Sequence, residues 1–243
     1  MKKFSIWMFL PLAFSVFTVA GLWIIYVIAI ENNKIIPLNS KYMISESKYP
    51  PFISLAGNNP PASCVFSQVM NVSAFAAFVI GVFRYVQVKP KIIKPWINIS
   101  SLTAFSLFCI GVSLIGNFQL DGDEEVHNFG TGMAFGFGTY LCWIQTLITF
   151  QINLRSEGRI LGFTRLTLSA AITFLMVIYY IFLNLNAIMH AARIQWSMVM
   201  LLITFLGTFA WDFRYHRFEL LCTDTQEAML CSPLPVEMSE QQV

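Results

Sequence analysis

The chain has 243 residues and a net charge of +2; 56% of its residues are hydrophobic and only 12% are charged. A soluble domain carries about 25% charged residues, so this chain lacks the polar surface that would cover a globule in water. The charge is also too small and too scattered for a nucleic-acid-binding protein, which leaves a membrane protein as the expected class.

Six apolar runs follow one another along the chain, each close to the roughly 20 residues that a helix needs to cross the hydrocarbon. They are predicted at residues 7–30, 65–86, 96–119, 129–152, 166–184 and 194–213. The first run is too long for the core of a signal peptide, so we interpret it as an uncleaved span. The expected fold is therefore an all-α bundle of six transmembrane helices over residues 1–213, followed by a disordered cytosolic tail, 214–243.

An even number of spans places both termini on the same side of the membrane. If that side is the cytosol, the inner segments hold 11 of the 15 lysines and arginines, which is the bias typical of cytosolic loops. We therefore predict cytosolic termini. Lys89, Lys91 and Lys94 would then lie beside the inner leaflet, where each should contribute about 1 kcal/mol of attraction to anionic lipid. Ordinary positive-inside signalling is the alternative role of these three lysines.

The first outer loop, residues 31–63, is the longest and is rich in proline. Pro37, the pair Pro50 and Pro51, and the pair Pro60 and Pro61 block long helices and favour turns and extended segments. Two interpretations stay open. The loop is either a stiff cap over the bundle or a flexible connector.

An acidic turn separates the third and fourth runs. Asp121, Asp123, Glu124 and Glu125 lie there, and His127 follows. Acids this close in sequence point apart, whereas a catalytic pair has to converge on one substrate. A calcium loop spreads its ligands over about twelve residues and ends in a bidentate Glu. We predict neither a metal site nor a catalytic site but a solvated outer turn; the alternative is a vestibule that concentrates cations within about 8 Å.

The middle of each span contains no ionisable residue, and Arg84, Arg165 and Asp212 lie at span ends. This argues against a voltage sensor and a proton relay, which need charges at depth. The HExxH and GxSxG motifs of hydrolases are absent, as is the TVGYG filter of potassium channels. We predict no enzymatic activity and no cofactor.

Neutral polar residues do occur within the spans. A side-chain amide in lipid is costly unless it is hydrogen-bonded, so we expect these amides to face the bundle interior. They are interpreted as interhelical hydrogen-bonding groups, with the lining of a conduction path as the alternative. The residues are Gln68, Asn71, Asn117, Gln119 and Gln145. Gly132 and Gly136 form a GxxxG motif that we expect to pack helices closely within the chain rather than between chains.

Several segments resemble a known family. PPASCVFSQVMN (60–71) and GNFQ (116–119) are similar to signatures of the six-span family that includes the damage-regulated autophagy modulators and the transmembrane protein 150 group. The segments WMFLPLAFSVFTVAGLWIIY (7–26), KIIPLNS (34–40) and DEEVHN (123–128) resemble the C branch of that group. The resemblance covers nearly the whole chain.

The resemblance implies a multi-pass plasma-membrane protein that takes part in slowly adapting, mechanically activated cation currents, as the pore or as a modulator. Other family members imply an alternative: a non-conducting scaffold or regulator in autophagy or in phosphoinositide kinase assembly, in an endosomal or lysosomal membrane. The expected partners are the bilayer with its anionic inner-leaflet lipids, and either another mechanosensitive channel or a second copy of the chain. Neither nucleic acid nor metal is expected.

Overall fold

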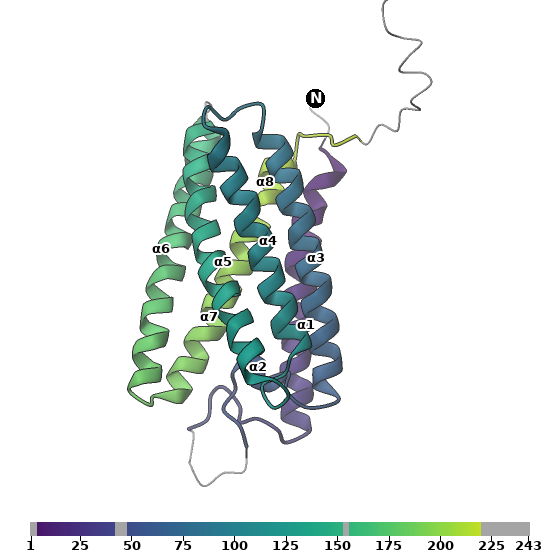
Figure 1. Cartoon of the computed structure of the whole chain (residues 1–243), viewed down its shortest axis with the longest axis vertical. Helices are drawn as coiled ribbons and strands as arrows, with labels where there is room; N and C mark the ends of the chain where they lie inside the picture. Colours follow the sequence, from purple (N-terminus) through teal and green to yellow (C-terminus); the bar gives the residue numbers. More distant parts are fainter. Residues whose placement is uncertain (1–3, 42–47, 153–155, 220–243) are drawn as a thin grey trace, which may run out of the picture.

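The computed structural model describes residues 4–41, 48–152 and 156–219. Long helices run up and down beside one another and form a bundle (Figure 1). The helices are η1 (Ile6–Met8), α1 (Phe9–Glu31), α2 (Ile53–Ala56), α3 (Ala62–Val88), α4 (Pro95–Asn117), α5 (Glu124–Ile152), α6 (Ser156–Asn184), α7 (Ile188–Gly207) and α8 (Phe209–Phe213). Ile35 and Tyr49 form an isolated β-bridge, and no β-strand occurs among the described residues.

Among the described residues, six helical stretches are long and apolar enough to cross a membrane, which confirms the predicted fold class. Most of the helices are longer than predicted and extend beyond the predicted ends. The third helix, α3, for example, begins at Ala62, directly after Pro61, and α5 begins at Glu124 rather than at Phe129. The last span begins at Ile188 and is divided at Thr208 into α7 and α8, whereas the sequence predicted one uninterrupted helix from residue 194.

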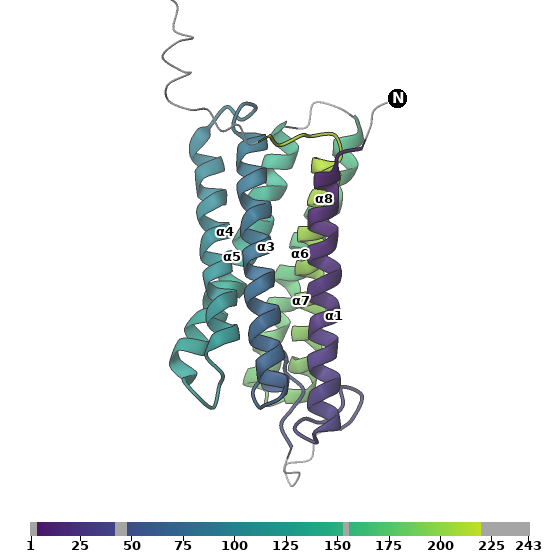
Figure 2. The same cartoon turned by 90° about the vertical axis from the view of Figure 1, so that its right-hand side faces the viewer.

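The helices pack as a closed ring in the order α1, α3, α4, α5, α6, α7 and back to α1. Figure 2 shows α1, α3 and α4 side by side along one flank. Helix α6, the fifth span, is peripheral. It packs mainly on α5 and α7, and 11% of its most apolar stretch is buried, against 33% to 50% for the other spans. Most of its surface is therefore free to contact lipid or another protein.

The two ends of the bundle differ, and we name them by their contents. The terminal end carries residues 4–8, the α3–α4 loop and residues 213–219; the loop end carries the long first loop and the α4–α5 turn (Figure 1). At the terminal end, the Ser5 amide donates to the Arg214 carbonyl at 2.8 Å, and the Phe218 ring stacks on Phe83. The predicted tail is thus packed at its start, and residues 220–243 lie outside the described part. Which end faces the cytosol stays a prediction.

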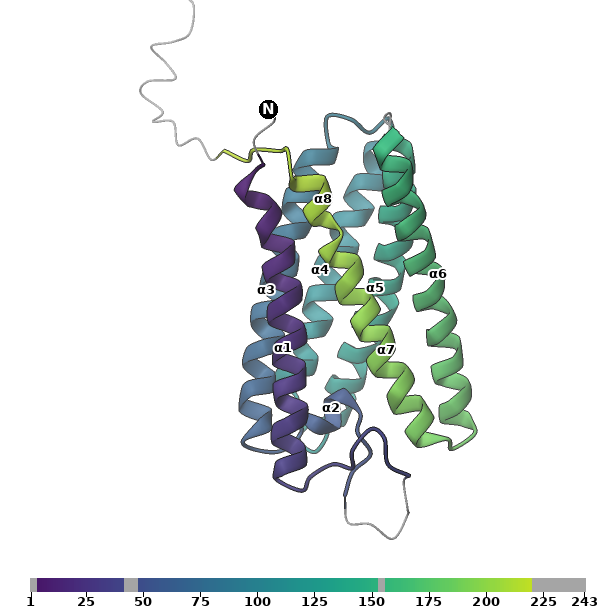
Figure 3. The ribbon, with the colours of Figure 1, turned by 180° about the vertical axis from the view of Figure 1, so that it is seen from behind.

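The described parts of the first loop are bound to the bundle at the loop end, as the stiff-cap interpretation predicts. The Trp196 indole donates to the Pro51 carbonyl at 2.8 Å, and the Arg193 guanidinium donates to the Leu38 carbonyl at 2.7 Å. Short helix α2 follows Pro51 and lies between α1 and α7, touching both (Figure 3). The loop therefore covers the place where these two spans diverge.

Close helix packing occurs at glycines other than the predicted pair. A Cβ atom at Gly111 of α4 would lie 2.7 Å from the backbone of both Gly130 and Ala134 in α5, so these two helices cross in direct backbone contact. A Cβ atom at Gly132 or Gly136 would meet nothing within 4 Å. The prediction that this GxxxG pair packs helices inside the chain is wrong, because a step of two residues turns about 200° around the helix and takes Gly132 away from the face of Gly130.

Alanine substitutions test which of these glycines lies at a close helix crossing. Gly111→Ala is expected to destabilise the bundle by about 1–3 kcal/mol, since the added methyl group meets backbone atoms that cannot rotate away. Gly132→Ala, the matched control, is expected to leave the stability unchanged or slightly raised, because alanine is the better helix former. The midpoint of unfolding in detergent micelles measures both. Equal midpoints for the two variants would contradict the assigned helix crossing.

Candidate functional site

Three ionisable side chains from three different spans converge inside the terminal end. Arg84 of α3 donates through Nη1 to Asp212 Oδ1 of α8 at 2.8 Å, and Arg165 of α6 donates through Nη2 to Asp212 Oδ2. The exposed fractions of the two arginine side chains are 5% and 0%, and that of the aspartate is 11%. We call Arg84, Arg165 and Asp212 the ionic cluster.

Neutral groups from α4, α5 and the α7–α8 break add hydrogen bonds to the ionic cluster. Gln145 of α5 accepts from Arg84 Nε at 3.1 Å and donates to Ser101 of α4 at 2.6 Å. Thr149 of α5 accepts from Arg165 Nη1 at 2.6 Å, and Thr208, at the α7–α8 break, accepts from Arg165 Nε at 2.9 Å. The cluster thereby connects five of the six spans.

The ionic cluster carries two positive charges and one negative charge, so it has a net charge of +1. Burying charge in this way is costly unless the surroundings compensate it. The ring of Phe209 lies 4.5 Å from the Arg165 guanidinium carbon and 5.7 Å from that of Arg84, and Phe205 lies 5.8 Å from Arg165. Aromatic faces attract cations, and these two rings offset part of the excess charge.

The geometry favours a structural role over acid–base chemistry. Both carboxylate oxygens of Asp212 are held by guanidiniums, so neither is free to take a proton from a substrate. In the part of the chain that the structure describes, no group of three or more His, Cys, Asp or Glu side chains could hold a metal ion.

A histidine next to the ionic cluster lies just beyond the last span. His216 Nε2 is 3.2 Å from Lys91 Nζ, and its Nδ1 is 2.8 Å from the Asp212 carbonyl. The ammonium can only donate, so Nε2 accepts from Lys91, and Nδ1 also lies 2.8 Å from the side-chain amide nitrogen of Gln87. Burial lowers the pKa of His216 below its usual range, with a further contribution from the charge of Lys91. The folded state therefore favours neutral His216, and the stability that this residue contributes decreases as the pH falls below the ordinary histidine range of about 6.5.

The amide side chains predicted to face the bundle interior differ in their positions and hydrogen bonds. Asn71 and Asn117 exchange amide hydrogen bonds of 2.8 Å and 3.1 Å between α3 and α4, and Ser67 and Ser113 join them. These contacts, like those of buried Gln145, match the interpretation as interhelical hydrogen-bonding groups, although Asn117 is exposed.

Two other amides lie elsewhere than expected. Gln68 is exposed, so the prediction that it faces the interior is wrong; the neighbouring Phe66 and Val69 occupy the buried face of α3 instead. Gln119 is half-buried but follows the end of α4, where it donates to the Gly116 carbonyl at 3.3 Å. It therefore closes the helix end rather than lining a path through the span.

The acidic residues of the α4–α5 turn are all exposed. Asp123 accepts from the Val126 amide at 3.1 Å and so caps α5, while Glu124 and Glu125 occupy the first turn of that helix, where its dipole favours negative charge. His127 is buried and bonds the Phe118 carbonyl. These positions agree with the predicted solvated turn, and a vestibule role stays a proposal.

The basic loop is exposed as well. Lys89, Lys91 and Lys94 lie at the terminal end between α3 and α4. Their contact with anionic lipid stays a prediction.

The ionic cluster was missed at the sequence level, although the positions of its charges were correct. Arg84, Arg165 and Asp212 were assigned to the ends of three spans and treated separately. The available signal was that all three ends were predicted to face the same side of the membrane, where opposite charges on neighbouring helices can meet. The order of the helices around the ring, which decides whether they do meet, is not apparent in a single sequence.

Fold and site together define a multi-pass α-helical membrane protein whose described interior is held by one charged cluster and by amide contacts. The sequence matches the family described as Frag1/DRAM/Sfk1/Cwh43P N-terminal domain over residues 6–216, and the chain belongs to this family.

Relatives place it in the transmembrane protein 150 group of that family. It is 35% identical over 207 residues to modulator of macroautophagy TMEM150B from Xenopus tropicalis, covering 85% of this chain and 86% of that protein. It is 30% identical over 235 residues to the Homo sapiens TMEM150B, covering 94% and 97%. It is 27% identical over 234 residues to Homo sapiens transmembrane protein 150A, covering 85% and 83%. No solved structure matches the chain.

Removing the carboxylate tests the role of the ionic cluster. Asp212→Asn leaves two buried guanidiniums without a counter-charge, so we expect a loss of about 3–5 kcal/mol in the free energy of unfolding. Asp123→Asn makes the same chemical change at an exposed position where asparagine also caps a helix, and it should have almost no effect. Denaturant unfolding in micelles provides the comparison. If the two variants were equally stable, the ionic cluster would not hold the spans together.

Proposed function

We propose that this protein is a non-conducting regulator of macroautophagy that acts from an internal membrane. The carrying observation is the match to relatives that are named modulators of macroautophagy, which extends over 85% to 94% of this chain. Those relatives are named as modulators and not as enzymes, which supports a regulatory role. An endosomal or lysosomal membrane is the location that this function requires.

The interior of the bundle supports a non-conducting role. A hydrated cation entering from the terminal end would meet the net positive charge of the ionic cluster. Deeper in, it would meet the apolar side chains Phe14, Leu22, Phe108 and Leu202. A cation that gives up its water for such surroundings loses far more free energy than they return. A path through a single copy of this bundle is therefore unfavourable.

The surface at the terminal end offers features for binding. Lys89 and Lys94 are exposed there, and Ile93 and Trp96 beside them are 95% and 62% exposed. Tryptophan is favoured where a bilayer meets water, and lysines there attract anionic headgroups. We therefore place contacts with anionic inner-leaflet lipid, and with a regulatory partner bound to it, at this loop.

Autophagic flux in cells tests the proposal. Deleting this chain together with its relatives should change the amount of lipidated autophagosome marker that accumulates when lysosomal degradation is blocked, and wild-type protein should restore it. The double variant Lys89→Gln/Lys94→Gln should restore it incompletely, because it loses about 2 kcal/mol of attraction to anionic lipid. Lys34→Gln/Lys41→Gln removes the same charge from exposed positions at the loop end and should restore it fully. Unchanged flux after deletion would refute the proposal.

A second candidate is a component of a mechanically activated cation channel in the plasma membrane. Two observations favour it: the resemblance to the C branch of the group, and the four exposed carboxylates of Asp121, Asp123, Glu124 and Glu125 at the loop end. Such a cluster raises the local cation concentration within about 8 Å at physiological salt. In this role the chain either forms a pore through self-association or modulates a separate mechanosensitive channel.

Stretching liposomes that contain only the purified protein distinguishes these roles. A pore-forming protein should give tension-activated current, and neutralising the four carboxylates to Asn and Gln should lower its divalent conductance most strongly at low salt. The absence of current at every tension would reject the pore. A modulator should then change currents only in cells that contain another mechanosensitive channel, and current persisting after deletion of such channels would contradict modulation.

A further inference from the structure

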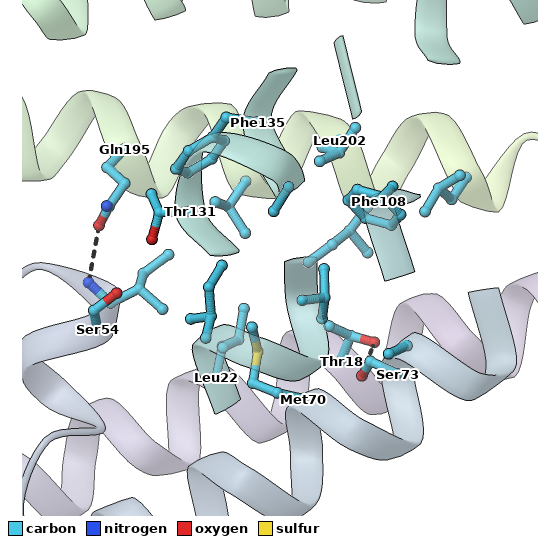
Figure 4. A pocket seen from close by; sticks show the side chains of 18 of the residues that line it. Thr18, Leu22, Ser54, Met70, Ser73, Phe108, Thr131, Phe135, Gln195 and Leu202 are labelled. Atoms are coloured by element: carbon cyan, nitrogen blue, oxygen red, sulfur yellow. Dashed lines mark hydrogen bonds between the residues drawn. The ribbon is translucent and has the colours of Figure 1, made fainter. Parts of the chain in front are cut away.

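A cavity of about 90 Å³ lies inside the bundle, and its wall is almost entirely apolar. Residues from α1, α2, α3, α4, α5 and α7 line it. Figure 4 shows the side chains of Leu22, Met70, Phe108, Phe135 and Leu202 arranged around the open space. Leu22 and Leu202 lie well inside their spans, so the cavity is at the depth of the hydrocarbon.

The polar groups at the wall are largely bonded within the protein. The hydroxyls of Thr18 and Ser73 bond each other at 2.8 Å on one side of the cavity, and Gln195 Oε1 accepts from the Ile53 amide at 2.9 Å on the other (Figure 4). Thr131 donates to the His127 carbonyl at 2.9 Å. A ligand here would therefore be held by contact with carbon atoms rather than by hydrogen bonds.

Physical chemistry restricts what can fill this space. Apolar cavities of this kind stay dry, because water finds too few polar partners in them. Leaving the cavity empty costs the wall its dispersion contacts on one side. A hydrocarbon group restores these contacts without any polar requirement, and lipid tails are the abundant hydrocarbon at this depth.

The small volume of the cavity limits its occupant to part of a single acyl chain. Pockets that hold drug-sized molecules measure about 300–1,000 Å³, so this cavity is too small for a rigid fused-ring molecule such as a sterol. The end of a single flexible acyl chain is thin enough to enter.

Aromatic side chains and α2 bridge the first and last spans at the loop end of the cavity: the Trp196 ring of α7 lies 4.8 Å from Trp23 and 5.6 Å from Tyr26 of α1. The first and last spans diverge toward the loop end, and α2 lies between them (Figure 3). Ile53 and Ser54 of α2 form part of the cavity wall, and the bond from the Ile53 amide to Gln195 fastens α2 to α7. This four-residue helix therefore forms the loop-end wall of the cavity.

We propose that the cavity binds the end of one acyl chain of a bilayer phospholipid. This binding site does not depend on either candidate function. A tail held there would contact five spans and α2 at once, and would make the packing of the loop end responsive to the surrounding lipid.

Photolabelling of the full chain in phosphatidylcholine nanodiscs tests the site. A phosphatidylcholine with a diazirine at the end of one acyl chain is activated by light, and the adducts are mapped by mass spectrometry of peptides. We expect adducts on the cavity residues Met70, Phe135 and Leu202. Adducts on lipid-facing Phe75 and Phe174, which are 70% and 65% exposed, serve as the internal reference.

Filling the cavity provides the matched comparison. Ala74→Leu and, independently, Ala134→Leu place extra carbon atoms in the wall; displacing the chain should lower the ratio of cavity adducts to Phe75 adducts about tenfold, the change expected for a penalty of about 1.4 kcal/mol. Ala20→Leu makes the same substitution on the exposed side of α1 and should leave the ratio unchanged.

The result in the wild-type protein is decisive even if a filled variant fails to fold. Absence of cavity adducts while Phe75 and Phe174 are labelled would overturn the proposal. So would an unchanged adduct ratio in a folded Ala74→Leu or Ala134→Leu variant. Stronger cavity labelling by a diazirine sterol than by the phospholipid would overturn the assignment of the occupant.

Discussion

The carboxylate of Asp212 holds two guanidiniums, and the arrangement of five spans at the terminal end depends on that one group. Inside a bilayer the hydrophobic effect does not drive helices together, because lipid tails are as apolar as the side chains they would replace. Association therefore relies on polar contacts and on close backbone packing. The ionic cluster and its glutamine and threonine partners supply the first, and the crossing of α4 and α5 at Gly111 supplies the second.

The loop end is built differently. There the first and last spans separate, a short helix and a bonded loop cover the opening, and the interior holds an apolar cavity instead of charges (Figure 3). The ionic cluster bonds the spans to one another at the terminal end, whereas α2 lies between two of them at the loop end. The helices can therefore change their packing around α2 without breaking the ionic cluster. Both candidate functions, regulation through a partner and response to membrane tension, can use such an asymmetry.

The class of fold was predictable because it depends on local composition: six apolar runs bounded by charges and prolines appear directly in the sequence. The bonding of Asn71 and Asn117 between helices was also accessible, since a side-chain amide within a span requires a partner. The faces of the helices were less accessible. Gln68 and Gly132 point outward because the helical period sets their direction, and evenly apolar spans give that period little signal. The meeting of Arg84 and Arg165 at Asp212 depends on which helices are neighbours, which only the folded chain specifies.

The order of the charges along the chain has a consequence for biosynthesis. Asp212 follows Arg84 by 128 residues and Arg165 by 47, so both arginines leave the ribosome long before the group that neutralises them. Until the final segment is inserted, neither guanidinium has its counter-charge, and the earlier spans cannot settle into their mature arrangement at that end. A nascent or prematurely terminated polypeptide that stops short of position 212 would therefore remain an open assembly, exposed to the quality control that recognises unpaired charge in a membrane.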